Sequence, residues 1–182
     1  MKLFEKTLSS QPIYDGHIIH VHVDDVELEN GAAAKREVVD HPGGVSVAVL
    51  TAENELIFVR QFRYPYKKVL LELPAGKLEP GEDPFEAMKR EQAEETGTRG
   101  ENYVSLGDVY PTPGYCGEII RLWACREVGT QQGLHLDEDE FLATECIPLD
   151  RAVEMVCNNE IPDAKTQIGV LKTAFLVKNG LI

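Results

Sequence analysis

The chain has 182 residues, of which 43% are hydrophobic, and 31 acidic against 18 basic residues give it a formal net charge of −13. This length and apolar content suit one globular domain, or one domain with a small additional lobe. The acidic balance argues against nucleic acid as a partner, because phosphate backbones attract basic surfaces, and a phosphorylated substrate would need cations to mediate its binding.

Membrane and secretion signals are not expected. No segment approaches 18 consecutive apolar residues, and the first ten residues hold no apolar signal-peptide core. The four cysteines have spacings of 9, 21 and 11, which fit no metal motif; they are Cys116, Cys125, Cys146 and Cys157. Reduced structural thiols in a cytoplasmic protein are therefore the expectation.

The first part of the chain predicts a small antiparallel β lobe. Residues 17–28 alternate apolar and polar side chains, which indicates a strand. The turn signal Glu-Asn-Gly at 29–31 leads into a second predicted strand at 35–40. The sequence HPGG at 41–44 then breaks the pattern, so we expect the lobe to comprise residues 1–43.

Residues 44–182 predict a second domain in which strands and helices mix. The predicted strands are 45–50, 56–62, 69–73, 103–109, 119–125 and 141–147, and the predicted helices are one that begins at Pro84, 149–158 and 164–178. The first two strands flank the turn at 52–54 and are expected to form a hairpin. Because the elements follow no regular βαβ period, we predict an α+β fold around a mixed sheet.

The first of these helices has clear start and stop signals. Asp83 is a good N-cap, Pro84 stands at the first helical position and Glu86 at the third. Gly97 suits the left-handed residue that follows a helix. Phe85 and Met88 share one face of the predicted helix, which we expect to point inward.

Three carboxylates share another face of this helix. Glu91, Glu94 and Glu95 lie three or four residues apart, and like charges at that spacing are unfavourable by about 0.2–0.5 kcal/mol per pair. Glu86 is expected to pair with Arg90 and offset part of this repulsion. A solvated acidic face is the alternative, but no lysine balances this side, so we favour neutralisation by a hard divalent cation.

Residues 76–98 resemble the signature of the Nudix family, G-x5-E-x7-R-E-U-x-E-E-x-G-U, where U is a bulky apolar residue. All seven fixed letters are matched at the required spacing, by Gly76, Glu82, Arg90, Glu91, Glu94, Glu95 and Gly97. Gln92 and Thr98 depart from the pattern because they occupy the two U positions. Gln92 falls on the inward face, where a buried amide without partners would cost about 1–3 kcal/mol.

The resemblance implies a Nudix α/β/α sandwich around a mixed sheet, and hydrolysis of a nucleoside diphosphate linked to another group. The metal is expected to be Mg²⁺, with Mn²⁺ as the alternative, and it would neutralise the diphosphate and activate water. The implied metal ligands are Glu91, Glu95, a further carboxylate from Glu94 and the carbonyl of Ala75. Glu82 and Arg90 match a supporting ion pair.

Several further segments are similar to those of bacterial ADP-ribose pyrophosphatases, among them LELPAGKLEPGE, TPGYCGE and the late DAKT. In that subgroup a proline follows the last glycine of the signature by about sixteen residues, which here is Pro113. The implied reaction is cleavage of ADP-ribose to AMP and ribose 5-phosphate. The general base of the subgroup comes from a later acidic loop, which matches Glu138 as the base and Glu140 as a supporting carboxylate, although a solvated acidic turn is the plainer alternative.

The resemblance also implies substrate contacts and a homodimer. Arg63 and Arg36 match arginines that contact the nucleotide, with surface ion pairs as the alternative for each. Glu118 matches a residue near the terminal ribose, or has a structural role. In the subgroup the N-terminal lobe packs across a two-fold axis, so Arg36 would act across a dimer interface.

Two other functions remain open at this point. The same chemistry could act on another nucleoside diphosphate sugar, such as GDP-mannose. A non-catalytic Nudix-like domain that binds ADP-ribose is the second alternative, but such domains usually lose carboxylates of the signature, and all are present here.

Overall fold

The computed structural model describes residues 3–130 and 142–182, and they divide into two compact units. The first unit is Met1–Gly43 with Tyr110–Ile119, and the second is Gly44–Val109 with Ile120–Ile182. The segment Tyr110–Ile119 was expected in the second domain. It groups with the first unit because it continues the edge of that unit's sheet: Val39 N donates to Tyr115 O at 2.8 Å.

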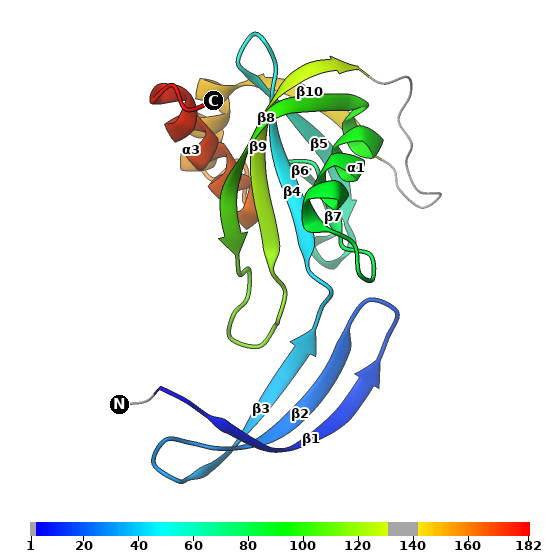
Figure 1. Cartoon of the computed structure of the whole chain (residues 1–182), viewed down its shortest axis with the longest axis vertical. Coiled ribbons are helices and arrows are strands. Elements are labelled where there is room, and N and C mark those ends of the chain that lie inside the picture. Colours follow the sequence, from blue (N-terminus) through cyan, green and yellow to red (C-terminus); the bar gives the residue numbers. More distant parts are fainter. Residues whose placement is uncertain (1–2, 131–141) are drawn as a thin grey trace. The chain divides into compact units, whose positions relative to one another are not determined.

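The first unit is built on a three-stranded antiparallel sheet in the order β1-β2-β3 (Figure 1). Its strands are β1 (Lys6–Asp15), β2 (His20–Glu27) and β3 (Ala33–Asp40). The strands β2 and β3 correspond to the two predicted ones, whereas β1 was not predicted from the sequence. Its residues KTLSSQPIYD do not alternate between apolar and polar, and Pro12 interrupts the run.

The second unit contains a seven-stranded mixed sheet. Its strands are β4 (Gly44–Leu50), β5 (Glu55–Arg63), β6 (Lys68–Glu72), β7 (Ala75–Lys77), β8 (Thr98–Val109), β9 (Ile120–Thr130) and β10 (Leu142–Pro148). The main order is β10-β5-β4-β9-β8, with β6 beside β5 and β7 beside β4. Strand β4 runs parallel to β9 and antiparallel to β5, which confirms the predicted mixed sheet.

Helices cover both faces of this sheet, as Figure 1 shows. They are α1 (Pro84–Thr96), α2 (Leu149–Cys157) and α3 (Ala164–Lys178). Alternate residues of β4 point to opposite faces: Val47 joins the cluster around Met88 of α1, whereas Leu50 joins the cluster around Val156 of α2 and Val170 of α3. The second unit is therefore the α/β/α sandwich of the predicted α+β fold.

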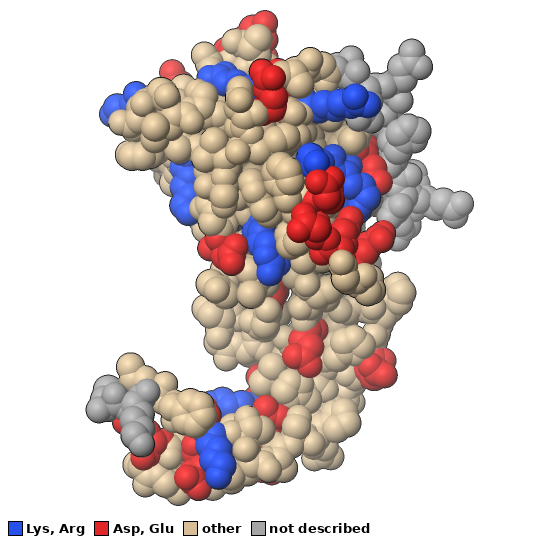
Figure 2. Space-filling view, viewed as in Figure 1, with Lys and Arg blue, Asp and Glu red and all other residues tan. Residues whose placement is uncertain are grey.

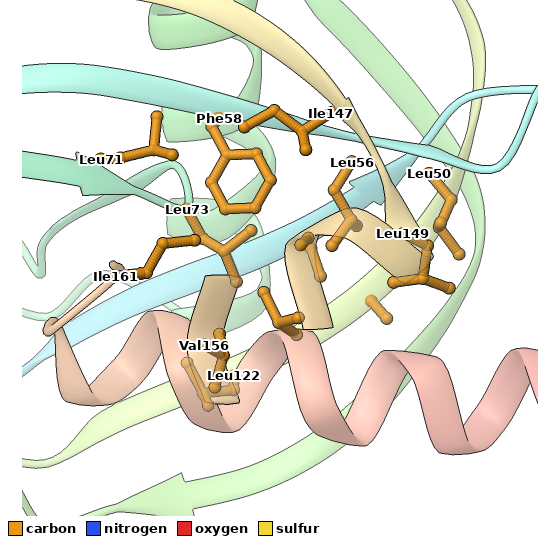
Figure 3. Packing of buried hydrophobic residues seen from close by; sticks show 14 of the residues in the cluster. Leu50, Leu56, Phe58, Leu71, Leu73, Leu122, Ile147, Leu149, Val156 and Ile161 are labelled. Carbon is orange, nitrogen blue, oxygen red and sulfur yellow. The ribbon is translucent and has the colours of Figure 1, made fainter. Parts of the chain in front are cut away.

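The larger core cluster lies between the sheet, α2 and α3, where Phe58, Leu73 and Leu122 pack together (Figure 3). Gly169 of α3 lets the helix approach the sheet, because a Cβ there would lie 2.4 Å from Leu73 Cδ1. None of the helices within 3–130 and 142–182 is long and apolar enough to cross a membrane.

Candidate functional site

Helix α1 begins and ends at the residues that the sequence predicted. Asp83 Oδ1 accepts hydrogen bonds from Phe85 N at 3.0 Å and Glu86 N at 3.1 Å, so it satisfies two of the unpaired amides at the helix start. Gly97 ends the helix in the left-handed region, with φ of 65°, and its N–H donates to Ala93 O. The carboxylates of this helix are therefore held at defined positions.

Two of these carboxylates approach neighbouring residues of β7. Glu95 is 2% exposed, and its Oε2 accepts a hydrogen bond from Ala75 N at 2.8 Å. Glu91 lies against the next residue, because a Cβ placed on Gly76 would fall 1.9 Å from Glu91 Oε1. Gly76 therefore leaves room that the Glu91 carboxylate fills, and the two glutamates face one backbone segment together.

Arg90 bridges three carboxylates beside this segment. Its Nε is 2.9 Å from Glu82 Oε1, and its Nη1 is 2.8 Å from both Glu91 Oε1 and Glu94 Oε2. The hydrogen bond with Arg90 lowers the pKa of Glu82, and these carboxylates raise the pKa of Arg90. Acidic and basic side chains lie side by side over α1 in Figure 2.

The expected pair between Glu86 and Arg90 is wrong. Glu86 Oε1 instead lies 2.7 Å from Lys89 Nζ, and Arg90 turns to the other side of the helix, where Glu82, Glu91 and Glu94 surround its guanidinium. Arg90, which belongs to the signature itself, therefore neutralises part of the acidic face. The sequence had predicted that a divalent cation would do so.

The donor set suits a hard cation that is completed by substrate and water. Within the described residues, no three His, Cys, Asp or Glu side chains already form a group able to hold a metal, and Arg90 engages both Glu91 and Glu94. Glu91 and Glu95 nevertheless approach one segment, which also carries the Ala75 carbonyl. Mg²⁺ usually combines one or two carboxylates with waters and substrate phosphates, so these residues fit it.

The two residues that depart from the signature are bonded to each other. Gln92 is fully buried, and its Nε2 donates to Thr98 Oγ1 at 3.2 Å. Its Oε1 accepts from Tyr103 OH at 2.9 Å and lies 3.7 Å from Cys125 Sγ. Burial raises the pKa of Cys125 to about 12, so this thiol is protonated and a donor. The buried amide therefore has the partners that its position requires.

Arg63 belongs to a second charged network in the same unit. Its Nε and Nη2 contact Glu72 Oε1 and Oε2 at 2.7 and 2.8 Å, and Lys165 Nζ also bonds to Glu72 Oε2. Burial favours a raised pKa for Glu72, but Arg63 and Lys165 outweigh it and hold that pKa at about 2. The sequence reading missed Glu72 and Lys165, for which the available signals were one acid within the apolar run KVLLELP and the DAKT stretch.

The remaining expected site residues lie elsewhere. In the first unit, Arg36 forms an exposed ion pair with Glu5, with its Nε 2.8 Å from Glu5 Oε2. Glu118 Oε1 lies 3.6 Å from His41 Nδ1, and Pro113 stands in the segment beside β3. Glu138 and Glu140 lie outside the described residues.

Comparison with known proteins adds to this geometry. A family model described as the NUDIX domain matches residues 40–168, and one described as the nucleoside diphosphate sugar hydrolase N-terminal domain matches residues 5–39. The chain is 40% identical over 169 residues to an "ADP-ribose pyrophosphatase" of Bacillus subtilis, which covers 92% of this chain and 91% of the relative.

Two further matches extend the comparison. The chain is 43% identical over 171 residues to a "Methanol dehydrogenase activator" of Bacillus methanolicus, covering 93% of this chain and 92% of the relative. A crystal structure described as an ADP compounds hydrolase superposes with a TM-score of 0.83 at 20% identity, covering 98% of this chain and 97% of the other. At that identity the likeness shows the fold alone.

Proposed function

The chain belongs to the Nudix hydrolase family, and from this premise we propose that it is a metal-dependent pyrophosphatase that cleaves ADP-ribose to AMP and ribose 5-phosphate. The observation that carries the proposal is the convergence of Glu91 and Glu95 on the Ala75–Gly76 backbone. The choice of ADP-ribose is supported by the Bacillus subtilis relative described as an "ADP-ribose pyrophosphatase", which is 40% identical over most of both chains.

We propose that Glu91, Glu95 and the carbonyl of Ala75 hold the metal, with Mg²⁺ as the expected ion and Glu94 as a further ligand. When bound, such an ion would offset the charge of the diphosphate and activate water for in-line attack on phosphorus. The role proposed for Arg90 is to hold Glu91 in place through its Nη1, while Glu82 fixes Arg90 from the other edge.

The substrate contacts are proposed on the resemblance stated above. Arg63 would bind the diphosphate, and Arg36, Pro113 and Glu118 would contact the nucleotide and the terminal ribose. Glu138 is proposed as the general base, supported by Glu140. A carboxylate suffices for this task, because water activated by a metal needs only a modest proton acceptor.

We further propose that the first unit mediates a homodimer. Every residue of β1 is exposed, and the apolar side chains Leu8, Ile13 and Tyr14 are each more than half exposed. A small sheet with this much exposed apolar surface needs a covering partner, and a second copy of the chain is the partner that the family resemblance implies. The four cysteines are free thiols, which supports action in the reducing cytoplasm.

A substrate panel tests the proposed reaction. The wild-type chain would be incubated with Mg²⁺ and ADP-ribose, GDP-mannose or NAD, the last of which adds nicotinamide to the same diphosphate unit. We expect the highest kcat/KM for ADP-ribose, with AMP and ribose 5-phosphate as products. A preference for GDP-mannose would contradict the substrate assignment. A direct assay is necessary because the chain is also 43% identical to the relative described as a "Methanol dehydrogenase activator".

The matched variant Glu95→Gln separates an enzyme from a binding domain. Glutamine keeps the shape of the side chain and an oxygen that accepts from Ala75 N, but it removes the charge. We expect turnover to fall by at least about 100-fold, with ADP-ribose affinity by calorimetry nearly unchanged. Unchanged turnover would show that Glu95 is not a metal ligand.

A further inference from the structure

The DAKT stretch at the start of α3 makes more contacts than a helix cap requires. Asp163 Oδ2 accepts from Thr166 N at 2.9 Å, which caps the helix. Thr166 Oγ1 accepts from Leu73 N at 2.9 Å, and Lys165 Nζ reaches both Asp163, at 3.0 Å, and Glu72. The stretch therefore ties α3 to the end of β6, just before the Ala75–Gly76 segment.

Glu72 lies at the centre of these contacts. It is 1% exposed, and Lys165 is 7% exposed, so both charges are buried. Asp163 and Arg63 complete the set, which has two positive and two negative groups. Buried ion pairs add little net stability compared with apolar side chains of similar volume, because desolvation offsets their attraction. A requirement for defined orientation explains this arrangement better than a requirement for stability.

The side chain that Glu72 orients is Arg63, the outermost member of the network. Glu72 binds the Nε and Nη2 edge of the guanidinium, and within the described part of the chain Nη1 has no hydrogen-bond partner. The side chain of Arg63 is 38% exposed, and the negative charge of Glu95 contributes to the raised pKa of Arg63. One edge of a fixed guanidinium is thus presented to solvent in the same unit as the proposed metal ligands.

We propose that Glu72 and Lys165 are positioning residues that hold the Arg63 guanidinium with its outer edge toward the diphosphate of the substrate. This inference rests on the proposed function. In it, neither Glu72 nor Lys165 touches the substrate. Lys165 shares the charge of Glu72, so that Arg63 is not the sole counterion of a buried carboxylate and its remaining N–H groups stay available to phosphate oxygens.

Steady-state kinetics of a set of variants test this role. Lys165→Met should raise KM for ADP-ribose about fivefold while kcat stays within about twofold, and Lys165→Arg should recover most of the loss. The matched control is Lys172→Met, which removes a lysine of the same helix that bonds to the Leu106 carbonyl and has no link to Arg63. Its KM should equal that of the wild type.

A double variant gives the decisive comparison. If Lys165 acts through Arg63, then Arg63→Ala with Lys165→Met should have the same KM as Arg63→Ala alone. Effects that multiply, or an unchanged KM for a folded Lys165→Met protein, would overturn the proposal. If Lys165→Met does not fold, Glu72→Gln with Lys165→Met removes both buried charges together, and wild-type KM in that protein would overturn it equally.

Failure of the proposed function would look different. If the wild-type chain prefers another nucleoside diphosphate sugar, the same variants are compared on that substrate, because Arg63 is assigned to the shared diphosphate. A wild-type chain that cleaves none of these compounds would end the proposed function and this inference together.

Discussion

Gly76 is a position where the neighbouring side chain, and not the backbone angle, excludes any larger residue. Its φ does not lie in the left-handed region, yet a Cβ would fall 1.9 Å from Glu91 Oε1. Gly76→Ala should therefore displace the Glu91 carboxylate. We expect kcat/KM for ADP-ribose to fall by about 100-fold, because misplacement of a catalytic group by about 1 Å has an effect of this size.

The measurement for Gly76→Ala is steady-state kinetics at several Mg²⁺ concentrations, accompanied by thermal unfolding. We expect the Mg²⁺ concentration for half-maximal rate to rise while the unfolding midpoint changes little. A variant with wild-type kinetics would show that the position of Glu91 against this backbone has no role in the reaction.

The charge of Glu72 makes stability depend on acid pH. Its pKa is about 2 in the folded chain against an ordinary value of 4.5, so the unfolded chain takes up the proton first as pH falls. The ionised Glu72 therefore contributes on the order of 3 kcal/mol to the free energy of unfolding. This contribution is fully present above pH 4.5 and is lost as the pH falls through about 2. We expect urea unfolding to show that wild type loses about 2 kcal/mol more between pH 6 and pH 3 than Glu72→Gln with Lys165→Met does. An equal fall in the free energy of unfolding in the two proteins would contradict this contribution of Glu72.

At the scale of elements, the contact between α1 and β8 depends on polar pairing at two positions where the signature expects apolar residues. Gln92→Leu removes the acceptor of the Tyr103 hydroxyl and of the buried Cys125 thiol, and Thr98→Val removes the acceptor of Gln92 Nε2. Each single variant should lower the free energy of unfolding by about 1–3 kcal/mol, because it leaves a buried polar group unpaired.

The double variant Gln92→Leu with Thr98→Val should be less destabilised than the sum of the two single variants. In the double variant both the Gln92 amide and the Thr98 hydroxyl are absent, so neither is left facing an apolar side chain. We therefore expect a coupling energy of at least about 1 kcal/mol by urea unfolding. Additivity within about 0.5 kcal/mol would show that the two departures from the signature are independent.

Most elements of the second unit could be predicted because their patterns are local. Asp83, Pro84 and Gly97 define the two ends of α1 within one short stretch, and the structure agrees with all three. Strand β7 was not predicted, because Pro-Ala-Gly before Lys77 has the composition of a turn. It is a strand only because β4 lies beside it, and sequence patterns do not show such long-range pairing.

The arrangement of the candidate site was predictable where its residues lie within one helix. The convergence of Glu91 and Glu95 follows from their spacing, whereas the pairing of Arg90 with Glu82 depends on how the loop before the helix returns Glu82 to it. Lys165 lies 93 residues from Glu72, and no local pattern links the two. The pairing of Gln92 with Thr98 likewise crosses the end of a helix. The sequence pattern therefore did not show that the buried amide has hydrogen-bond partners.

At the scale of the whole molecule, we propose that two copies of the chain form a dimer through the first unit. Ile13→Asp places a charge on the exposed apolar surface of β1 and should shift the mass in light scattering from twice 20.3 kDa towards 20.3 kDa. Phe175→Asp, at an exposed apolar residue of α3, is the matched control and should leave the mass unchanged. A wild-type mass of 20.3 kDa would contradict the dimer.

The measurement that tests the central claim most directly is the rate of AMP formation from ADP-ribose by the wild-type chain as Mg²⁺ is titrated from excess chelator to saturation. We predict no cleavage above background in chelator and a saturable rise with Mg²⁺, because we propose that Glu91 and Glu95 bind a cation that contacts the diphosphate. Cleavage at full rate in excess chelator would contradict the account.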